Sequence, residues 1–235
     1  MPYITIVGGT GLVGGAALSS LLASPTPLAI TALTRRALPA PAPANPGTTL
    51  TPYLLPDLAD AVAAARPLAG PGATYITALG ATRAAAGGLA GQERIDFALN
   101  RDLAARARAD GAETIILVSS GGADAASYSG YLRIKGLLED AVLGMGYART
   151  VILRPGVLLG RPDARAAEAA LGYMLRAARF AGLPTERWGI DAADVGAAVA
   201  QLALESGEGS DGVRYVEGGE MVALAAAWRA QSTSS

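Results

Sequence analysis

A glycine-rich turn directly after the first predicted strand is the feature that most constrains the fold of this chain. Tyr3–Val7 is rich in β-branched and aromatic residues, which is typical of a buried strand. It runs into the sequence GGTGLVGG at residues 8–15, and residues 16–23 then predict a helix that stops at Ser24-Pro25. A strand, a glycine turn and a helix in this order predict the first unit of a dinucleotide-binding α/β sheet.

The glycines of this turn have different expected roles. Gly8 and Gly11 allow a tight turn and a close approach of the backbone to a pyrophosphate, and Gly14 lets the helix pack on the sheet. The helix N-terminus supplies N–H groups and the positive end of a dipole. The spacing is GxxGxxG rather than GxGxxG, so the position after the strand carries the prediction. The predicted cofactor contacts here are Gly8, Thr10, Gly11, Leu12, Val13 and Gly14.

The end of the second predicted strand, residues 28–34, indicates which cofactor binds. An acidic residue at this point would bind the ribose 2′-hydroxyl of NAD, whereas an arginine accommodates the 2′-phosphate of NADP. The strand ends in Arg35-Arg36, and no acidic residue occurs before Asp57. We therefore predict that NADP(H) is preferred over NAD(H). The alternative is that both arginines only solvate the end of a strand.

Strands and helices alternate along the rest of the chain, which predicts a doubly wound parallel sheet of the Rossmann type. Four prolines within residues 39–46 predict a surface loop rather than a domain linker. We expect a single NAD(P)-binding domain over residues 1–235, with substrate-side elements at about 157–190 and 205–235. Further strands are predicted at 48–55, 73–79, 114–118, 150–153 and 213–216, and helices at 58–65, 93–109, about 131–143, 164–180, 195–204 and 220–229.

Loops at the carboxyl ends of parallel strands line the ligand crevice in a sheet of this kind. The loop after the predicted strand 73–79 is therefore expected to contact a cofactor or a substrate. The candidate contacts are Leu79, the last residue of the strand, and Gly80, Thr82 and Arg83 in the loop. A plain surface loop explains the same residues equally well.

Tyr131 and Lys135 are the strongest candidates for chemistry. Lys135 is the only lysine among nineteen basic residues, and it follows Tyr131 by four positions, which places both on one face of a helix. An ammonium group near a phenol stabilises the phenolate, so that a tyrosine can act as an acid or base near neutral pH. Ser120 follows the predicted strand 114–118 and is placed to donate a hydrogen bond to a substrate carbonyl. The alternatives are a surface Tyr/Lys pair and a simple Ser-Gly turn.

Composition removes several classes of chemistry. The chain has no cysteine and no histidine, which excludes disulfides, thiolate chemistry, histidine-dependent triads and histidine metal ligands, and no metal site is predicted. The net charge is −1 and the arginines are scattered, so no nucleic-acid partner is expected. No unbroken apolar run of about eighteen residues appears, so no membrane span is predicted. Because a strand is predicted from the first residues, no targeting segment is expected.

Four segments in order along the chain resemble the short-chain dehydrogenase/reductase superfamily: GGTGLVGG at 8–15, VSS at 118–120, YLRIK at 131–135 and LRPGVLLG at 153–160. The segment ALGATRAAAGG at 78–88, with ETIILVSS at 113–120, resembles its atypical branch, which contains the fungal mitochondrial FMP-type proteins and the animal Tat-interacting oxidoreductase. The resemblance implies a small NADP-binding protein. It also implies that Tyr131 moves a proton at the substrate oxygen, that Lys135 stabilises the phenolate and binds the nicotinamide ribose, and that Ser120 orients the carbonyl. Pro155 and Gly156 would border the nicotinamide.

Two departures from the superfamily pattern affect the expected site. The usual Asn-Ala-Gly after the fourth strand is replaced by Ala78-Leu79-Gly80, a change shared with the atypical branch, which leaves the proton relay open. The region after Gly160 is short, which predicts a small or open substrate site.

The expected function is that of an NADP-dependent oxidoreductase acting on a small carbonyl or alcohol substrate. The main alternative is a non-catalytic protein that senses NADP(H) and controls a partner. A third option is an epimerase or dehydratase with tightly held NAD, against which Arg35-Arg36 and the short C-terminal region argue. A monomer or homodimer is expected, in the cytoplasm or, by resemblance, peripherally on the mitochondrial outer membrane.

Overall fold

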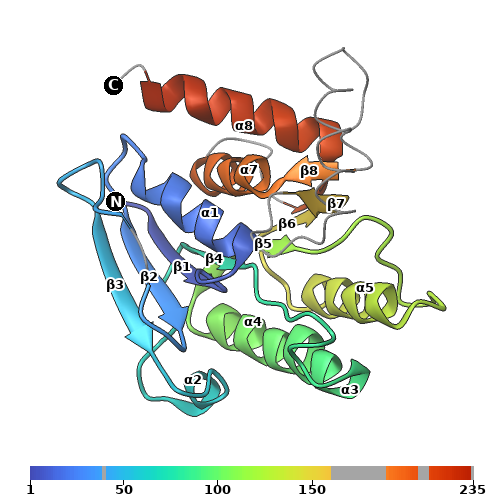
Figure 1. The fold of residues 1–235 in the computed structure, drawn as a ribbon. Helices are drawn as coiled ribbons and strands as arrows, with labels where there is room; N and C mark the ends of the chain where they lie inside the picture. Colours follow the sequence, from blue (N-terminus) through green and yellow to red (C-terminus); the bar gives the residue numbers. More distant parts are fainter. Residues whose placement is uncertain (39–40, 160–188, 206–211, 234–235) are drawn as a thin grey trace.

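The computed structural model describes residues 1–38, 41–159, 189–205 and 212–233. Its centre is a seven-stranded sheet in which every pairing is parallel, in the order β3-β2-β1-β4-β5-β6-β9 (Figure 1). The predicted parallel Rossmann-type sheet is therefore confirmed. The strands are β1 (Tyr3–Val7), β2 (Ala29–Thr34), β3 (Thr49–Leu54), β4 (Ala73–Thr77), β5 (Ala112–Val118), β6 (Arg149–Arg154) and β9 (Gly212–Glu217).

Helices cover both faces of the sheet, which is what a doubly wound fold requires because both faces of its strands are apolar. One buried apolar cluster joins the sheet to the helices on the upper face in Figure 1, and a second joins it to those on the lower face. The upper helices are α1 (Leu12–Leu22), α7 (Ala192–Leu204) and α8 (Gly218–Thr233). The lower ones are α2 (Asp60–Ala63), α3 (Leu89–Glu93), the π-helical turn η1 (Arg94–Leu99), α4 (Asn100–Ala109) and α5 (Gly130–Leu143).

The chain reverses its direction of winding at β1. From β1 it goes outward to β2 and β3, and it then returns to place β4 on the other side of β1. The carboxyl ends of β1 and β4 are held together, since the Ala78 N–H donates to the Val7 carbonyl at 3.1 Å. A ligand crevice is expected beside such a reversal point.

Several elements differ from the sequence expectation. Helix α1 begins at Leu12 instead of residue 16, because Gly11 is its N-cap residue and the glycines that follow are helical. The helix expected at 93–109 begins at Leu89 and contains the π-helical turn η1. A small parallel pair, β7 (Val157–Leu159) with β8 (Gly189–Asp191), was not predicted. The helix expected at 164–180 lies outside the described residues.

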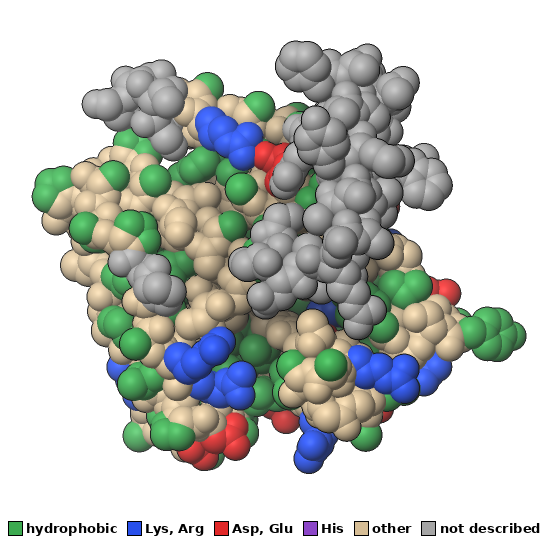
Figure 2. All heavy atoms as spheres, viewed as in Figure 1, with side chains coloured by type: hydrophobic (Ala, Val, Ile, Leu, Met, Phe, Trp, Pro, Cys, Tyr) green, Lys and Arg blue, Asp and Glu red, His purple; other side chains and the backbone are tan. Residues whose placement is uncertain are grey.

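Two surface properties complete the description of the fold. Figure 2 shows basic side chains at separate places on the face viewed, rather than in one continuous patch. Within the described ranges, no helix is both long enough and apolar enough to cross a membrane.

Candidate active site

The turn between β1 and α1 forms a cradle of bare backbone. Gly8 has φ +86°, and a Cβ atom on it would lie 2.6 Å from the carbonyl carbon of Ala78. A Cβ on Gly14 would lie 2.1 Å from the Gly8 carbonyl oxygen. Such contacts are far shorter than van der Waals separations, so larger residues do not fit here. Gly11 closes the turn by donating to the Gly8 carbonyl at 2.8 Å. The first turn of α1 follows this cradle, and the backbone N–H groups at a helix N-terminus are suited to bind a pyrophosphate.

The ends of β1 and β2 meet beside this cradle. The Arg36 guanidinium donates a hydrogen bond of 3.4 Å to the Thr10 hydroxyl, which joins the glycine turn to the end of β2. Arg35 and Arg36 are both exposed. Two predicted cofactor contacts, Thr10 and Arg36, are thus brought together, and a guanidinium at this place suits a ribose phosphate.

A buried ion pair lies beside the end of β4. Lys135, on α5, is only 5% exposed, and its Nζ atom is 3.7 Å from Oδ2 of Asp96, which is 1% exposed. A Cβ atom on Gly80 would lie 3.5 Å from that carboxylate and 3.7 Å from the ammonium, so the strand-end loop covers the pair closely. The structure therefore brings two predicted residues, Gly80 and Lys135, together around a carboxylate that the sequence analysis did not identify.

Three polar side chains from η1 and its neighbours hold the backbone of the strand-end loop. Asp96 accepts a 2.7 Å hydrogen bond from the Ala81 N–H. Gln92 donates to the Ala81 carbonyl at 2.9 Å, and Asn100 donates to the Leu79 carbonyl at 3.2 Å. Burial raises the pKa of Asp96 above its ordinary value, although the charge of Lys135 and the Ala81 N–H both act to lower it. A carboxyl group with a raised pKa, placed on a π-helical turn beside a crevice, is typical of a functional site.

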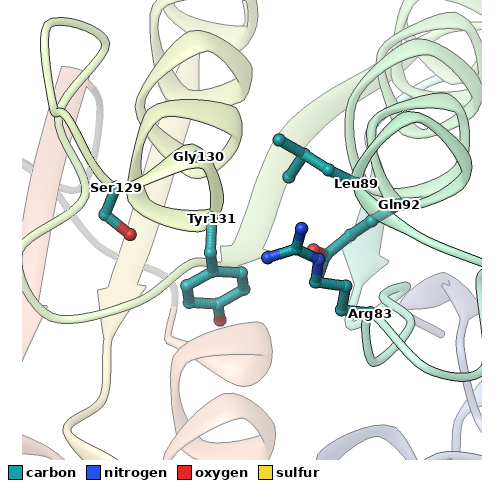
Figure 3. A pocket seen from close by; sticks show the side chains of 6 residues that line it. All are labelled: Arg83, Leu89, Gln92, Ser129, Gly130 and Tyr131. Carbon is teal, nitrogen blue, oxygen red and sulfur yellow. The ribbon is translucent and has the colours of Figure 1, made fainter.

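Tyr131 lines a cavity of about 270 Å³ between α3 and the start of α5. Its side chain is 40% exposed. In Figure 3 the guanidinium of Arg83 points across this cavity toward the tyrosine ring, and Leu89 and Gln92 of α3 lie next to it. Ser129 and Gly130, at the start of α5, complete the described lining. Arg83 was predicted to contact a cofactor or substrate, and the structure places it beside Tyr131.

Ser120 and Pro155 lie at the ends of the neighbouring strands β5 and β6. The Gly121 N–H donates to the Pro155 carbonyl at 2.7 Å, which joins the two strand-end loops. The Ser120 hydroxyl points back to its own loop, at 3.4 Å from the Gly121 carbonyl oxygen. Thr82 accepts a hydrogen bond of 3.2 Å from the Ala85 N–H, which is the ordinary turn role that the sequence analysis left open.

Glu139 fixes α5 against the same two strands. It is 2% exposed, accepts a hydrogen bond from the Ser119 hydroxyl, and forms a 2.5 Å ion pair with Arg154. The hydrogen bond to Glu139 is the main reason that the pKa of Arg154 is raised, so this arginine stays charged. Glu139 follows Lys135 by one helical turn, and its contacts therefore set the position of Lys135 relative to the strand ends.

Sequence reasoning missed Gln92, Asp96, Asn100 and Glu139. A signal for three of them was present, because Gln92, Asp96 and Asn100 recur every four residues and form a polar stripe on one face of a helix. In an exposed helix such a stripe faces solvent, and only the packing of η1 on the strand-end loop turns it inward. Glu139 had the corresponding signal on α5, four residues after Lys135.

Proteins with clear sequence similarity share most of the length of this chain. No protein-family model matches it. "Protein fmp52, mitochondrial" from Aspergillus fumigatus is 41% identical over 175 residues, which cover 74% of each chain. The protein of the same name from Emericella nidulans is 34% identical and covers 94% of this chain and 98% of its own. The FMP52 protein of Candida albicans, also named as mitochondrial, is 35% identical over 94% of this chain and 96% of its own.

Solved structures share the fold at lower sequence identity. A putative NAD-dependent epimerase/dehydratase from Bacillus halodurans superposes with a TM-score of 0.63 at 18% identity, over 97% of this chain and all of its own. A short-chain dehydrogenase/reductase from Saccharomyces cerevisiae gives 0.59 at 14% identity, over 92% and 95% of the two chains. MoeE5, solved in complex with UDP-glucose and NAD, gives 0.60 at 18% identity, over 95% and 81%.

Proposed function

The chain belongs to the FMP52 family, and from that premise we propose that it is an NADP-dependent oxidoreductase of the short-chain dehydrogenase/reductase type. Its substrate would be a carbonyl compound or the corresponding alcohol. The observation that carries the proposal is the buried ammonium of Lys135 beside the β4 strand-end loop, on the same helix as Tyr131. A lone buried lysine next to a ligand crevice requires a reason, because burial of an ammonium group is costly.

The glycine cradle supports a dinucleotide cofactor. Gly8 and Gly14 have no room for a side chain, and this close backbone approach is what a pyrophosphate needs. Arg36, bonded to Thr10 at the edge of the cradle, supports NADP over NAD, because its guanidinium matches a 2′-phosphate. Solved structures of the same fold hold NAD, which supports a nicotinamide cofactor in general. When bound, that cofactor would exchange a hydride with the substrate carbon.

The residues of this chain would handle the proton and the orientation of the substrate. Tyr131 would give a proton to the substrate oxygen in reduction and take it in oxidation, because it is accessible and lines the cavity. Lys135 would supply the positive charge that favours phenolate, with Asp96 holding its ammonium group in place. Ser120 would orient the carbonyl, and Pro155 and Gly156 would border the nicotinamide.

The proton role of Tyr131 is tested by removing its hydroxyl. In Tyr131→Phe we expect NADPH oxidation with a panel of small aldehydes and ketones to fall by roughly 10²- to 10⁴-fold, since that is the usual contribution of a positioned acid or base. The dissociation constant for NADPH should not change. Tyr128→Phe is the matched control, because Tyr128 lies three residues earlier and is fully exposed.

The outcomes separate the two leading functions. Normal turnover in Tyr131→Phe would refute the assigned role. Tight NADPH binding by the unmodified protein, without turnover of any compound in a broad panel, would favour the NADP(H)-sensing alternative instead.

A further inference from the structure

The cavity beside Tyr131 is lined by a positively charged side chain, which indicates the kind of ligand that it binds. We propose that it takes the carboxylate group of a small oxo acid, with Arg83 as the anchor, so that the substrates are acidic carbonyl compounds and their hydroxy acids. This inference rests on the proposed function, because Tyr131 is the acid or base for the carbonyl in the same cavity.

Arg83 is the only charged residue among the described residues that line the cavity. No acidic residue occurs from position 61 to position 92, so nothing nearby along the chain offsets its charge. Lys135, the other cation of the site, already has Asp96 as its partner. Within the described part of the chain, Arg83 pairs with no carboxylate. An anion entering this cavity would therefore meet a guanidinium that no carboxylate of the described residues neutralises.

The direction of Arg83 fits recognition of a substrate. Its guanidinium points across the cavity toward the ring of Tyr131 (Figure 3). A planar guanidinium binds a carboxylate through two parallel hydrogen bonds, which would fix the orientation of a ligand as well as attract it. A molecule held in this way by its acid group would present the rest of its chain to Tyr131.

The other lining residues limit the size of the ligand and add polar contacts. A cavity of about 270 Å³ is near the lower end of the range for ligand pockets, so the ligand is small. Leu89 and Gly130 form a tight side of it, since a Cβ on Gly130 would lie 2.8 Å from Leu89 Cδ2. Ser129 is the N-cap residue of α5 but makes no capping hydrogen bond through its side chain, which leaves its hydroxyl available to a ligand.

A matched pair of aldehydes tests the carboxylate requirement. 4-Oxobutanoate and butanal have the same four-carbon chain and the same reactive aldehyde, and differ by one carboxylate. With NADPH, we expect the kcat/KM for 4-oxobutanoate to exceed that for butanal by tenfold or more, which is the scale of one charged hydrogen bond. In Arg83→Gln this preference should disappear. Arg94→Gln is the matched control, because Arg94 is an exposed arginine on the adjacent element and is not part of the described lining.

A binding measurement separates this inference from the enzyme hypothesis. Succinate resembles 4-oxobutanoate but has no aldehyde to reduce, so its binding to the NADP-loaded protein can be titrated by calorimetry without turnover. We expect binding to weaken about tenfold in Arg83→Gln and to stay unchanged in Arg94→Gln. Butanamide serves as the uncharged comparison. It should bind the unmodified protein and Arg83→Gln with the same affinity.

Each outcome has a distinct meaning. Arg83-dependent binding of succinate without any turnover would support the anion site and refute the oxidoreductase. Equal turnover of both aldehydes, unchanged in Arg83→Gln, would support the oxidoreductase and overturn the anion site. Failure of succinate to bind would also overturn it. A weaker affinity for NADPH in Arg83→Gln, with the preference between the aldehydes unchanged, would assign Arg83 to a cofactor phosphate and overturn the proposal.

Discussion

At the scale of single residues, the most informative feature is the carboxylate of Asp96 beside the ammonium of Lys135. Both groups are buried. The free energy needed to remove two charges from water is larger than the attraction of an ion pair at 3.7 Å readily offsets. The raised pKa of Asp96 has the same cause, because burial makes the ionised carboxylate less favourable in the folded protein than in the unfolded chain. A group that lowers stability in its working form is expected at a functional site.

This raised pKa predicts a dependence of stability on pH. An unfolded aspartate titrates near about 3.9. Between that value and the higher pKa of folded Asp96, the native state binds more protons than the unfolded state, so stability falls as pH rises through this window. The variant Asp96→Asn lacks this titration. In urea unfolding from pH 4 to pH 7, the free energy of unfolding of the unmodified protein should fall relative to that of Asp96→Asn.

A parallel pH profile for the two proteins would contradict the raised pKa of Asp96. The role of Asp96 as a positioning residue has a separate readout. In Asp96→Asn the kcat should fall and its pH profile should change, because the ammonium of Lys135 loses the carboxylate that holds it in place.

At the scale of elements, the sequence was informative about strands and less so about where helices begin. The strand 3–7 was predicted at its observed bounds, and the other strands of the large sheet differ by one or two residues. The start of α1 was missed by four residues, since Gly14 and Gly15 have poor helix propensity and read as a loop. The three-residue strands β7 and β8 are too short for a periodic pattern.

The site shows the same division between local and tertiary information. The residues that follow strands were predictable, because their place in the chain fixes the edge of the sheet at which they lie. Asp96 and Glu139 were not, because their burial depends on how η1 and α5 pack on loops distant in sequence.

Replacing glycine by alanine in two neighbouring helices should change the stability of the protein in opposite directions. A Cβ on Gly196 of α7 would lie 2.5 Å from the carbonyl carbon of Ala16 in α1, so Gly196→Ala should separate these helices and cost about 1–3 kcal/mol. Gly219, at the exposed start of α8, has nothing within 4 Å of such a Cβ atom, and Gly219→Ala should stabilise by about 0.4–1 kcal/mol. Urea denaturation measures both. Equal effects of the two changes would refute the close contact of α1 with α7.

At the scale of the whole molecule, the proposed cofactor site joins elements that are distant in sequence. It includes the turn after β1, the arginines after β2, the loop after β4 and helix α5. Because β1 lies in the middle of the sheet, these contacts draw on both of its halves. A cofactor that binds only the folded state should therefore stabilise the whole fold.

Thermal unfolding should reveal both this stabilisation and the preference for NADP. NADPH at one hundred times its dissociation constant should add about 2.7 kcal/mol. For a chain of this size that corresponds to a rise of roughly 5–10 °C in Tm. NADH at the same concentration should raise Tm less. In Arg36→Gln the two cofactors should become equal, whereas Arg101→Gln, a change at an exposed arginine on α4, should keep the difference. An unchanged preference in Arg36→Gln would remove Arg36 from the cofactor site.

Because Lys135 is the only lysine, its side chain can be labelled selectively without any mutation. A reagent that acylates amines has one side-chain target in all 235 residues, and that target is buried in the proposed catalytic crevice. A protease that cleaves only after lysine would cut the chain once, into fragments of residues 1–135 and 136–235, and only after α5 opens. Acylation of Lys135 and cleavage of the peptide bond after it therefore both report on the opening of the site, and no probe has to be introduced.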